Sequence, residues 1–354
     1  MNKKYKIATI LGARPQFIKA SPISALIHKK KIFHEVIIHT GQHFDENMSD
    51  VFFKQMNIPK PAHNLNINQM DYGNMIDSMF QKIIKIIKKE RIDGVLVFGD
   101  TNSTLAGSLS ATHLQIPIFH VEAGLRSYNK EMPEENNRVI TDHLSSLLFC
   151  PTESAKNNLS NEGIISNVLI SGDVMYDAYL RFSFNKNKIQ SFIPPYKYLL
   201  ATLHRRENLN SKSKLKMIFN NLDKINEKIK IIMPLHPHTK KMIKDYSIKT
   251  KIIFIEPVGY LSMISLLNNS EMVITDSGGL QKESYFAKKK AIVVRTETEW
   301  KELVRAGVNE LSSPIKLYDT FEKISQKNVK FSKKYYGEGN ASKIIVDNIR
   351  NFFK

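Results

Sequence analysis

The sequence predicts an α/β protein built from two Rossmann-like domains. Short apolar runs such as "GVLVFGD" and "IPIFHVE" alternate with amphipathic stretches along the chain of 354 residues, as in strand–helix–strand units. The strand-like runs are apolar at successive positions, which is typical of parallel strands covered by helices on both faces. The alternation also comes in two series, which a polar, proline-containing break separates.

The break, "RFSFNKNKIQSFIPPYK", has the composition of a linker. We therefore predict an N-terminal Rossmann-like domain at residues 1–182, a linker at 183–197 and a C-terminal Rossmann-like domain at 198–340. The two domains are expected to face each other across a cleft. A last helix at 341–354 can pack on either domain.

Composition excludes several classes of protein. The net charge of +18 comes from lysines spread through the chain, without a basic stripe interleaved with aromatic residues, so we expect no nucleic-acid partner. No apolar run reaches about eighteen residues, so no integral membrane segment is predicted. "IATIL" is too short for a signal peptide. Cys150 is the single cysteine, which excludes a disulfide framework and favours a cytoplasmic protein.

A candidate phosphate site lies in the second series. Ser277, Gly278 and Gly279 stand between an expected strand and helix, where backbone N–H groups and the helix N-terminus favour a diphosphate. Glu283 lies one turn further and could accept hydrogen bonds from ribose hydroxyls. A turn with a helix cap and no ligand explains the same residues.

The first turn, "LGARPQFIK", has one glycine where a dinucleotide fingerprint has three, which argues against a bound nicotinamide cofactor. It does supply two cations, Arg14 and Lys19, that could meet phosphate or developing negative charge.

Three acids follow strands or begin the helix after them, at the edge where open α/β sheets bind ligands: Asp100, Glu122 and Glu134. Clustered carboxylates can serve as base and acid. Glu134 also fits a simpler account, since an acid in a first helical turn complements the helix dipole. Arg138, one turn later, could be no more than its ion-pair partner.

Histidines form the last group of candidates. His204 ends an apolar strand and precedes two arginines, which indicates a catalytic or phosphate-binding role. His236 and His238 could ligate zinc, but no third and fourth ligands stand at a recognised spacing, so no metal is predicted. Trp300 could line the cleft or pack in the core.

Eight stretches then occur in an order that resembles the non-hydrolysing UDP-N-acetylglucosamine 2-epimerase family over nearly the whole chain. They are "GARPQFIKASP", "HTGQHFD", "GDTNSTLAGSLSA", "HVEAGLRS", "MPEENNR", "HRREN", "PLHPHT" and "TDSGGLQKES". The resemblance implies the two-domain GT-B fold, a UDP-sugar substrate and no redox cofactor. It also implies elimination of UDP to a 2-acetamidoglucal, followed by re-addition of UDP with inversion at C2.

The same resemblance assigns roles to individual residues. The catalytic set is Asp100, Glu122, Glu134 and His204. The residues that bind UDP or lie near the substrate are Arg14, Lys19, Arg138, His236, Ser277, Gly278, Gly279, Glu283 and Arg295. A second, regulatory UDP-sugar would involve Gln42, His43, Gln69 and Arg206. We also expect a homodimer, although the sequence itself does not fix the oligomeric state.

Three departures from the family pattern concern the substrate. Gln16 replaces a glutamate, Trp300 interrupts a "TERPE" motif, and the loop from Glu122 to Glu134 is shorter. These variants resemble a subgroup acting on UDP-2,3-diacetamido-2,3-dideoxyglucuronate, which supplies surface polysaccharides. The alternatives are a hydrolysing epimerase, a GT-B glycosyltransferase and a non-catalytic UDP-sugar sensor. A glycosyltransferase would share the fold and the nucleotide site but would not need the three carboxylates together with His204, and the same acids argue against a sensor.

Overall fold

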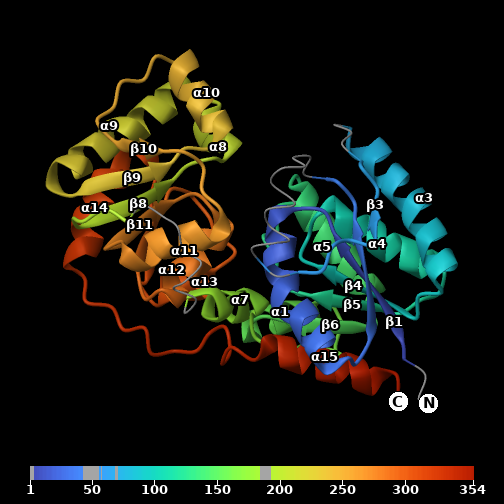
Figure 1. Ribbon diagram of the computed structural model, residues 1–354. Coiled ribbons are helices and arrows are strands. Elements are labelled where there is room, and N and C mark those ends of the chain that lie inside the picture. The colour runs from blue at the N-terminus through green and yellow to red at the C-terminus, as the bar shows by residue number, and fades with distance from the viewer. Residues whose placement is uncertain (1–3, 43–55, 57, 68–70, 184–192) are drawn as a thin grey trace. The chain divides into compact units, whose positions relative to one another are not determined.

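Two parallel β-sheets organise the chain (Figure 1). The computed structural model describes residues 4–42, 56, 58–67, 71–183 and 193–354. It divides into two units, Met1–Arg181 with Lys334–Lys354, and Phe182–Lys333. Each unit holds one of the sheets with helices packed on it, which confirms the two Rossmann-like domains predicted from the strand pattern.

The first unit contains a seven-stranded sheet in the order β3-β2-β1-β4-β5-β6-β7. Every pair of neighbouring strands is parallel. The central strand β4 is buried at all its positions, which explains its continuous apolar run. The strands are β1 (Lys6–Leu11), β2 (His34–His39), β3 (His63–Asn64), β4 (Gly94–Phe98), β5 (Ile118–Val121), β6 (Leu147–Cys150) and β7 (Val168–Ile170).

The helices of this unit begin at capping signals that the sequence carries. Asp71, Thr101 and Thr152 each accept a hydrogen bond from a backbone N–H group of the first turn. Proline occupies the first turn of two further helices, where its missing N–H is not needed. The helices are α1 (Arg14–Lys30), α3 (Tyr72–Glu90), α4 (Asn102–His113), α5 (Pro133–Leu144), α6 (Glu153–Asn161), α7 (Val174–Ser183) and α15 (Ala341–Phe352).

The second unit repeats the plan with six parallel strands in the order β10-β9-β8-β11-β12-β13. The strands are β8 (Tyr198–Thr202), β9 (Lys230–Pro234), β10 (Ile253–Ile255), β11 (Met272–Thr275), β12 (Lys290–Val293) and β13 (Asn309–Leu311). The α-helices are α8 (Arg206–Leu209), α9 (Lys212–Lys228), α10 (Pro237–Asp245), α11 (Tyr260–Asn269), α12 (Gly278–Phe286), α13 (Lys301–Arg305) and α14 (Leu317–Gln326).

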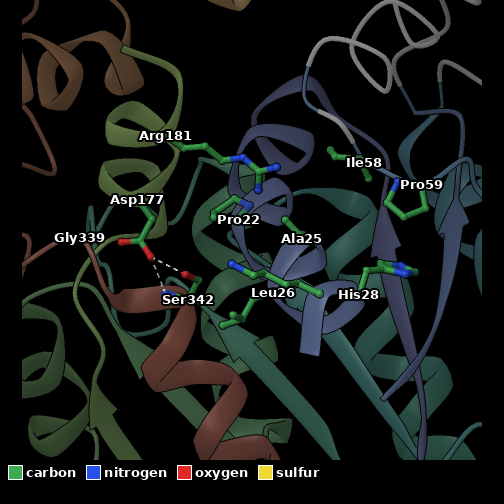
Figure 2. Close-up of a pocket in the computed structure, with 11 residues that line it drawn as sticks. Pro22, Ala25, Leu26, His28, Ile58, Pro59, Asp177, Arg181, Gly339 and Ser342 are labelled. Carbon is green, nitrogen blue, oxygen red and sulfur yellow. Dashed lines mark hydrogen bonds between the residues drawn. The ribbon is translucent and has the colours of Figure 1, made fainter. Parts of the chain in front are cut away.

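The C-terminal helix α15 packs in the first unit, against α1. Its N-terminus is capped by Asp177 of α7, which accepts from the backbone N–H groups of Ala341 and Ser342 and from the Ser342 hydroxyl (Figure 2). The backbone N–H of Asp173 also donates to Tyr336 O at 3.0 Å. These contacts explain why the second unit ends at Lys333 rather than at residue 340.

Within the described ranges, none of the helices combines the length and apolar composition that crossing a bilayer requires.

Candidate active site

In each sheet the order of the strands reverses beside the first strand of the unit. In the first unit β1 lies between β2 and β4, and in the second β8 lies between β9 and β11. Ligands of open α/β sheets bind outside the carboxyl ends of the strands at such switch points. Lys19 and Asp100 lie beyond the switch point of the first sheet, and His204 and Ser277 beyond that of the second.

Glu122 forms a largely buried ion pair with Lys19. Each side chain is 9% exposed, and Lys19 Nζ donates to Glu122 Oε1. Glu122 has a φ of 71°, in the left-handed region that side-chain-bearing residues rarely adopt. The ion pair lies beside Gly99, which follows β4 and has a φ of 63°. A side chain at this position would crowd the pair, because its Cβ would lie 3.1 Å from Lys19 Nζ.

Asp100 is held by α5. Arg138 donates to the carboxylate of Asp100 and, through its other terminal nitrogen, to Glu135. Asn137 donates to the backbone carbonyl of Asp100 at 2.9 Å. Burial lowers the pKa of Arg138, but the charges of Asp100 and Glu135 raise it overall, so the guanidinium stays charged. Arg138 therefore pairs with these two acids.

Glu134 and Glu135 have different environments although they are neighbours. Glu134 is exposed on the first turn of α5. The pKa of the Tyr72 hydroxyl is raised, mainly by the burial of Tyr72 and secondly by the negative charge of Glu134. Glu135 is buried and accepts from the backbone N–H groups of Ser127 and Tyr128. Burial would raise the pKa of Glu135, yet these hydrogen bonds and Arg138 lower it. Glu135 therefore fixes the loop, and Glu134 faces solvent.

A buried polar network underneath Glu122 was not predicted from the sequence. His120 Nδ1 lies 2.7 Å from Asp142 Oδ1, and Arg126 Nη1 donates to the other oxygen of Asp142. Arg126 then makes two hydrogen bonds of 2.7 Å with Glu162. Asp142 also accepts from the backbone N–H of Gly124 at 3.1 Å. The whole loop that follows Glu122 is thus tied to α5 and α6.

In the second unit Asp276 organises the residues around His204. Its carboxylate is 0% exposed and accepts from the backbone N–H groups of His204 and Arg205 and from Asn208 Nδ2. The imidazole side chain of His204 is 43% exposed, and its Nδ1 lies 3.3 Å from Asp276 Oδ1. Its centroid lies 6.2 Å from that of His236, which caps α10 through Nδ1. Two of the predicted histidines therefore come together.

The Ser277-Gly278-Gly279 turn has open space in front of it. Ser277 caps α12 by accepting from Leu280 N. A Cβ at Gly279 would meet nothing within 4 Å. Trp300 secures the turn from the side, since its indole Nε1 donates to Gly278 O at 3.0 Å. The N-terminus of α12 is thus accessible and held in place, as an anion site requires.

Arg295 and Glu283 flank this turn. Arg295 makes two hydrogen bonds, of 3.0 and 3.1 Å, to the carboxylate of Glu299. Burial alone would raise the pKa of Glu299, but its hydrogen bonds and ion pair with Arg295 lower it. Glu283, on α12, is 6% exposed.

Gln16 has a structural role. Its Oε1 accepts from the backbone N–H groups of Gly12 and Ala13, and its Nε2 donates to Phe98 O and Thr104 Oγ1. The side chain is 1% exposed and all these bonds are internal. This departure from the family pattern therefore serves the packing of the first turn, and its relation to the substrate stays a prediction.

The proposed regulatory residues are only partly described. Gln42 Oε1 accepts from Ser103 Oγ at 2.8 Å, which ties it to the start of α4. Arg206 is the exposed first residue of α8, in the other unit. His43 and Gln69 lie outside the described residues.

A pocket of about 740 Å³ lies elsewhere in the first unit, between α1, α7 and α15 (Figure 2). None of the residues that line it is a predicted site residue, so we do not assign the chemistry to it. In the part of the chain that the structure describes, no group of three His, Cys, Asp or Glu residues is arranged to hold a metal ion. Cys150 is buried, which raises its pKa to about 12 and makes the thiol unreactive.

Comparison with known proteins decides the family. A family profile described as UDP-N-acetylglucosamine 2-epimerase matches residues 25–350. The chain belongs to the UDP-N-acetylglucosamine 2-epimerase family. It is therefore an enzyme of the isomerase class, and its two Rossmann-like domains are those of the predicted GT-B fold.

Similar family members cover the full chain. It is 48% identical, over 98% of its length and 99% of the relative, to a UDP-N-acetylglucosamine 2-epimerase homolog of Methanococcus maripaludis. It is 44% identical to the UDP-2,3-diacetamido-2,3-dideoxy-D-glucuronate 2-epimerase of Pseudomonas aeruginosa, over 97% and 98% of the two chains. The Methanocaldococcus jannaschii UDP-GlcNAc 2-epimerase, solved with UDP-GlcNAc and UDP, is 41% identical with a TM-score of 0.89, covering 98% and 99%.

Proposed function

We propose that the protein is a non-hydrolysing UDP-N-acetylglucosamine 2-epimerase, which interconverts UDP-GlcNAc-type and UDP-ManNAc-type sugars. The observation that carries this proposal is the pair of carboxylates at adjacent strand ends, Asp100 and Glu122, each held by its own buried cation. The family match over residues 25–350 supports the reaction type.

The chemistry makes clear demands on the site. The C2–H bond of the sugar is not next to a carbonyl, so its proton is a poor acid. A base removes this proton while the C1–O bond to UDP breaks, giving a 2-acetamidoglucal and free UDP. UDP then adds back to C1, and C2 receives a proton on the opposite face. Both directions require carboxylates near the ring and stabilisation of the departing diphosphate.

We assign these roles by unit. Asp100, Glu122 and Glu134 supply the acid–base groups, and Lys19 and Arg138 hold the first two of them. Ser277, Gly278 and Gly279 receive the diphosphate at the start of α12, assisted by His204, His236 and Arg295. Arg14 adds positive charge, and Glu283 accepts from the ribose. No redox cofactor enters the reaction.

The second candidate substrate is UDP-2,3-diacetamido-2,3-dideoxyglucuronate. The 44% identical Pseudomonas aeruginosa relative is named for this sugar. Trp300, which departs from the commoner family motif, lies beside the phosphate turn. Gln16 does not add support for this second substrate, because its hydrogen bonds are all internal.

One experiment separates the candidates. The protein is incubated in D₂O with UDP-GlcNAc or with UDP-2,3-diacetamido-2,3-dideoxyglucuronate, and the products are followed by NMR. The proposal expects both C2 epimers of UDP-GlcNAc, each still carrying UDP and deuterium at C2. Conversion of the diacetamido sugar alone favours the second candidate. Free sugar accumulating with UDP indicates a hydrolase, and no exchange with any donor overturns epimerisation.

We further propose that the enzyme works in the cytoplasm as a homodimer. Its single buried cysteine suits a reducing compartment. Light scattering coupled to size exclusion tests the oligomeric state, since a dimer has twice the chain mass of 40.7 kDa and a monomer contradicts the proposal.

A further inference from the structure

His120 connects the two strand ends that carry Asp100 and Glu122. It lies on β5, paired in register with Val97 of β4, and is 0% exposed. Its Nε2 lies 2.8 Å from the carbonyl oxygen of Gly99, the residue before Asp100. Its Nδ1 lies 2.7 Å from Asp142 Oδ1 of α5. One ring therefore joins β4, β5 and α5.

Both ring nitrogens of His120 face groups that only accept hydrogen bonds. A backbone carbonyl has no proton to donate, so Nε2 must carry one. Asp142 could supply the other proton only if it were neutral. Burial would raise the pKa of Asp142, but Arg126 Nη1 and the backbone N–H of Gly124 both donate to its Oδ2, which favours the ionised carboxylate. Asp142 is therefore a carboxylate, and Nδ1 must donate as well.

The charges of the network favour a protonated ring. Two anions, Asp142 and Glu162, meet Arg126 and His120. Glu162 is 27% exposed, so the carboxylate that needs a buried counter-charge is Asp142, which has to share Arg126 with Glu162. The thiol of Cys150 is neutral, because burial raises its pKa to about 12. Lys19 and Glu122, which lie beside Gly99, cancel each other.

We propose that His120 is a buried, doubly protonated positioning residue that fixes the spacing between the two catalytic acids, Asp100 and Glu122. This inference rests on the proposed function, because it concerns the acid–base groups of that reaction. His120 does not touch the substrate. It holds Gly99 and Glu122, which follows β5 two residues after His120, and both are in the left-handed backbone region. Without the ring these two residues can relax, and small misplacements of acid–base groups slow a reaction strongly.

The protonation state has a direct test. The full chain is labelled with ¹⁵N-histidine, and the His120 resonances are assigned by their loss in His120→Gln. The proposal expects two N–H couplings and imidazolium nitrogen shifts at neutral pH. A single protonated nitrogen at neutral pH overturns it. This readout needs no enzyme activity.

Two variants test the positioning role. The amide nitrogen of His120→Asn replaces Nδ1 and keeps the donor to Asp142, and that of His120→Gln replaces Nε2 and keeps the donor to Gly99. Each variant keeps one of the two hydrogen bonds of His120 and loses the other. We therefore expect the rate of C2 deuterium exchange at saturating substrate to fall about 100-fold in both. Affinity for UDP is expected to stay within about twofold of wild type, since the turn proposed to receive the diphosphate lies in the other unit. The exposed His143→Asn on α5 is the matched control.

The outcomes separate the two proposals. Exchange rates per folded molecule within threefold of wild type in both variants would overturn the positioning role, even if the melting temperature falls. A wild-type chain that exchanges no deuterium with any UDP-sugar would overturn the proposed function, whereas the nitrogen spectra would still decide the charge of His120.

Discussion

Lys19 Nζ donates to Glu122 Oε1 in a pair that is almost closed to solvent, with each side chain 9% exposed. An anion in such a place depends on its cation, because an uncompensated buried charge is strongly destabilising. The pair brings α1 and the end of β5 together at the switch point of the first sheet.

Replacing Lys19 tests how far Glu122 depends on it. In Lys19→Met the carboxylate of Glu122 loses its counter-charge, becomes harder to ionise and serves poorly as a base. We expect the rate of C2 deuterium exchange to fall by about 10²–10³-fold. Lys19→Arg keeps the charge in a different shape and should retain more activity than Lys19→Met. Equal rates for Lys19→Met and wild type would contradict a role of the pair in catalysis.

Asp276 offers a test of stability in the second unit. Its buried carboxylate accepts from His204 N, Arg205 N and Asn208 Nδ2. In Asp276→Asn one oxygen becomes an NH₂ group that faces donors, so the free energy of unfolding should fall by about 1–3 kcal/mol. Urea titration of the full chain measures this. The exposed Asp245→Asn, at the end of α10, is the control, and an equal stability for both variants would contradict the role of Asp276.

The Arg295–Glu299 pair predicts a pH dependence. The pKa of Glu299 in the folded chain lies below its ordinary value of 4.5, so the pair stabilises the fold above that value and the contribution is lost as the pH falls through the lower folded pKa. Glu299→Gln should therefore reduce the free energy of unfolding by about 3 kcal/mol at neutral pH. The difference from wild type should shrink below about pH 4.5. A difference that grows on acidification would contradict the sign.

Trp300 is predicted to hold the phosphate turn. Its indole N–H donates to Gly278 O, and Lys282 Nζ lies 4.2 Å from the centroid of its ring. Trp300→Phe removes the hydrogen bond and keeps an aromatic ring for Lys282, so affinity for UDP should weaken by about three- to tenfold. Trp300→Ala removes both contacts and should weaken it further. Calorimetric titration with UDP checks the order, and unchanged affinity in both variants would exclude this role.

The sequence predicted those parts of the site that depend on local order. Asp100, Glu122 and His204 follow apolar runs that become strands, and parallel strands place their carboxyl ends at one edge of a sheet. The turn before α12 was also visible, because glycines after a strand and before a helix have a local meaning.

The supporting groups were missed because their partners are distant in sequence. Arg126 meets Glu162 and Asp142 only after α5 and α6 have packed on the sheet. Asp142 looks like an ordinary acid of an amphipathic helix until its burial is known. Asp276 did carry a signal, since it follows an apolar strand run much as Asp100 does in the first unit.

The central claim is that the C1–O bond to UDP breaks and forms again. UDP-GlcNAc labelled with ¹⁸O in the oxygen that bridges C1 and the β-phosphorus provides the most direct measurement, followed by ³¹P NMR during turnover. Elimination and re-addition predict that the label spreads into the non-bridging oxygens of the β-phosphate, at a rate comparable to deuterium entry at C2. Epimerisation with the label fixed in the bridge would contradict the account.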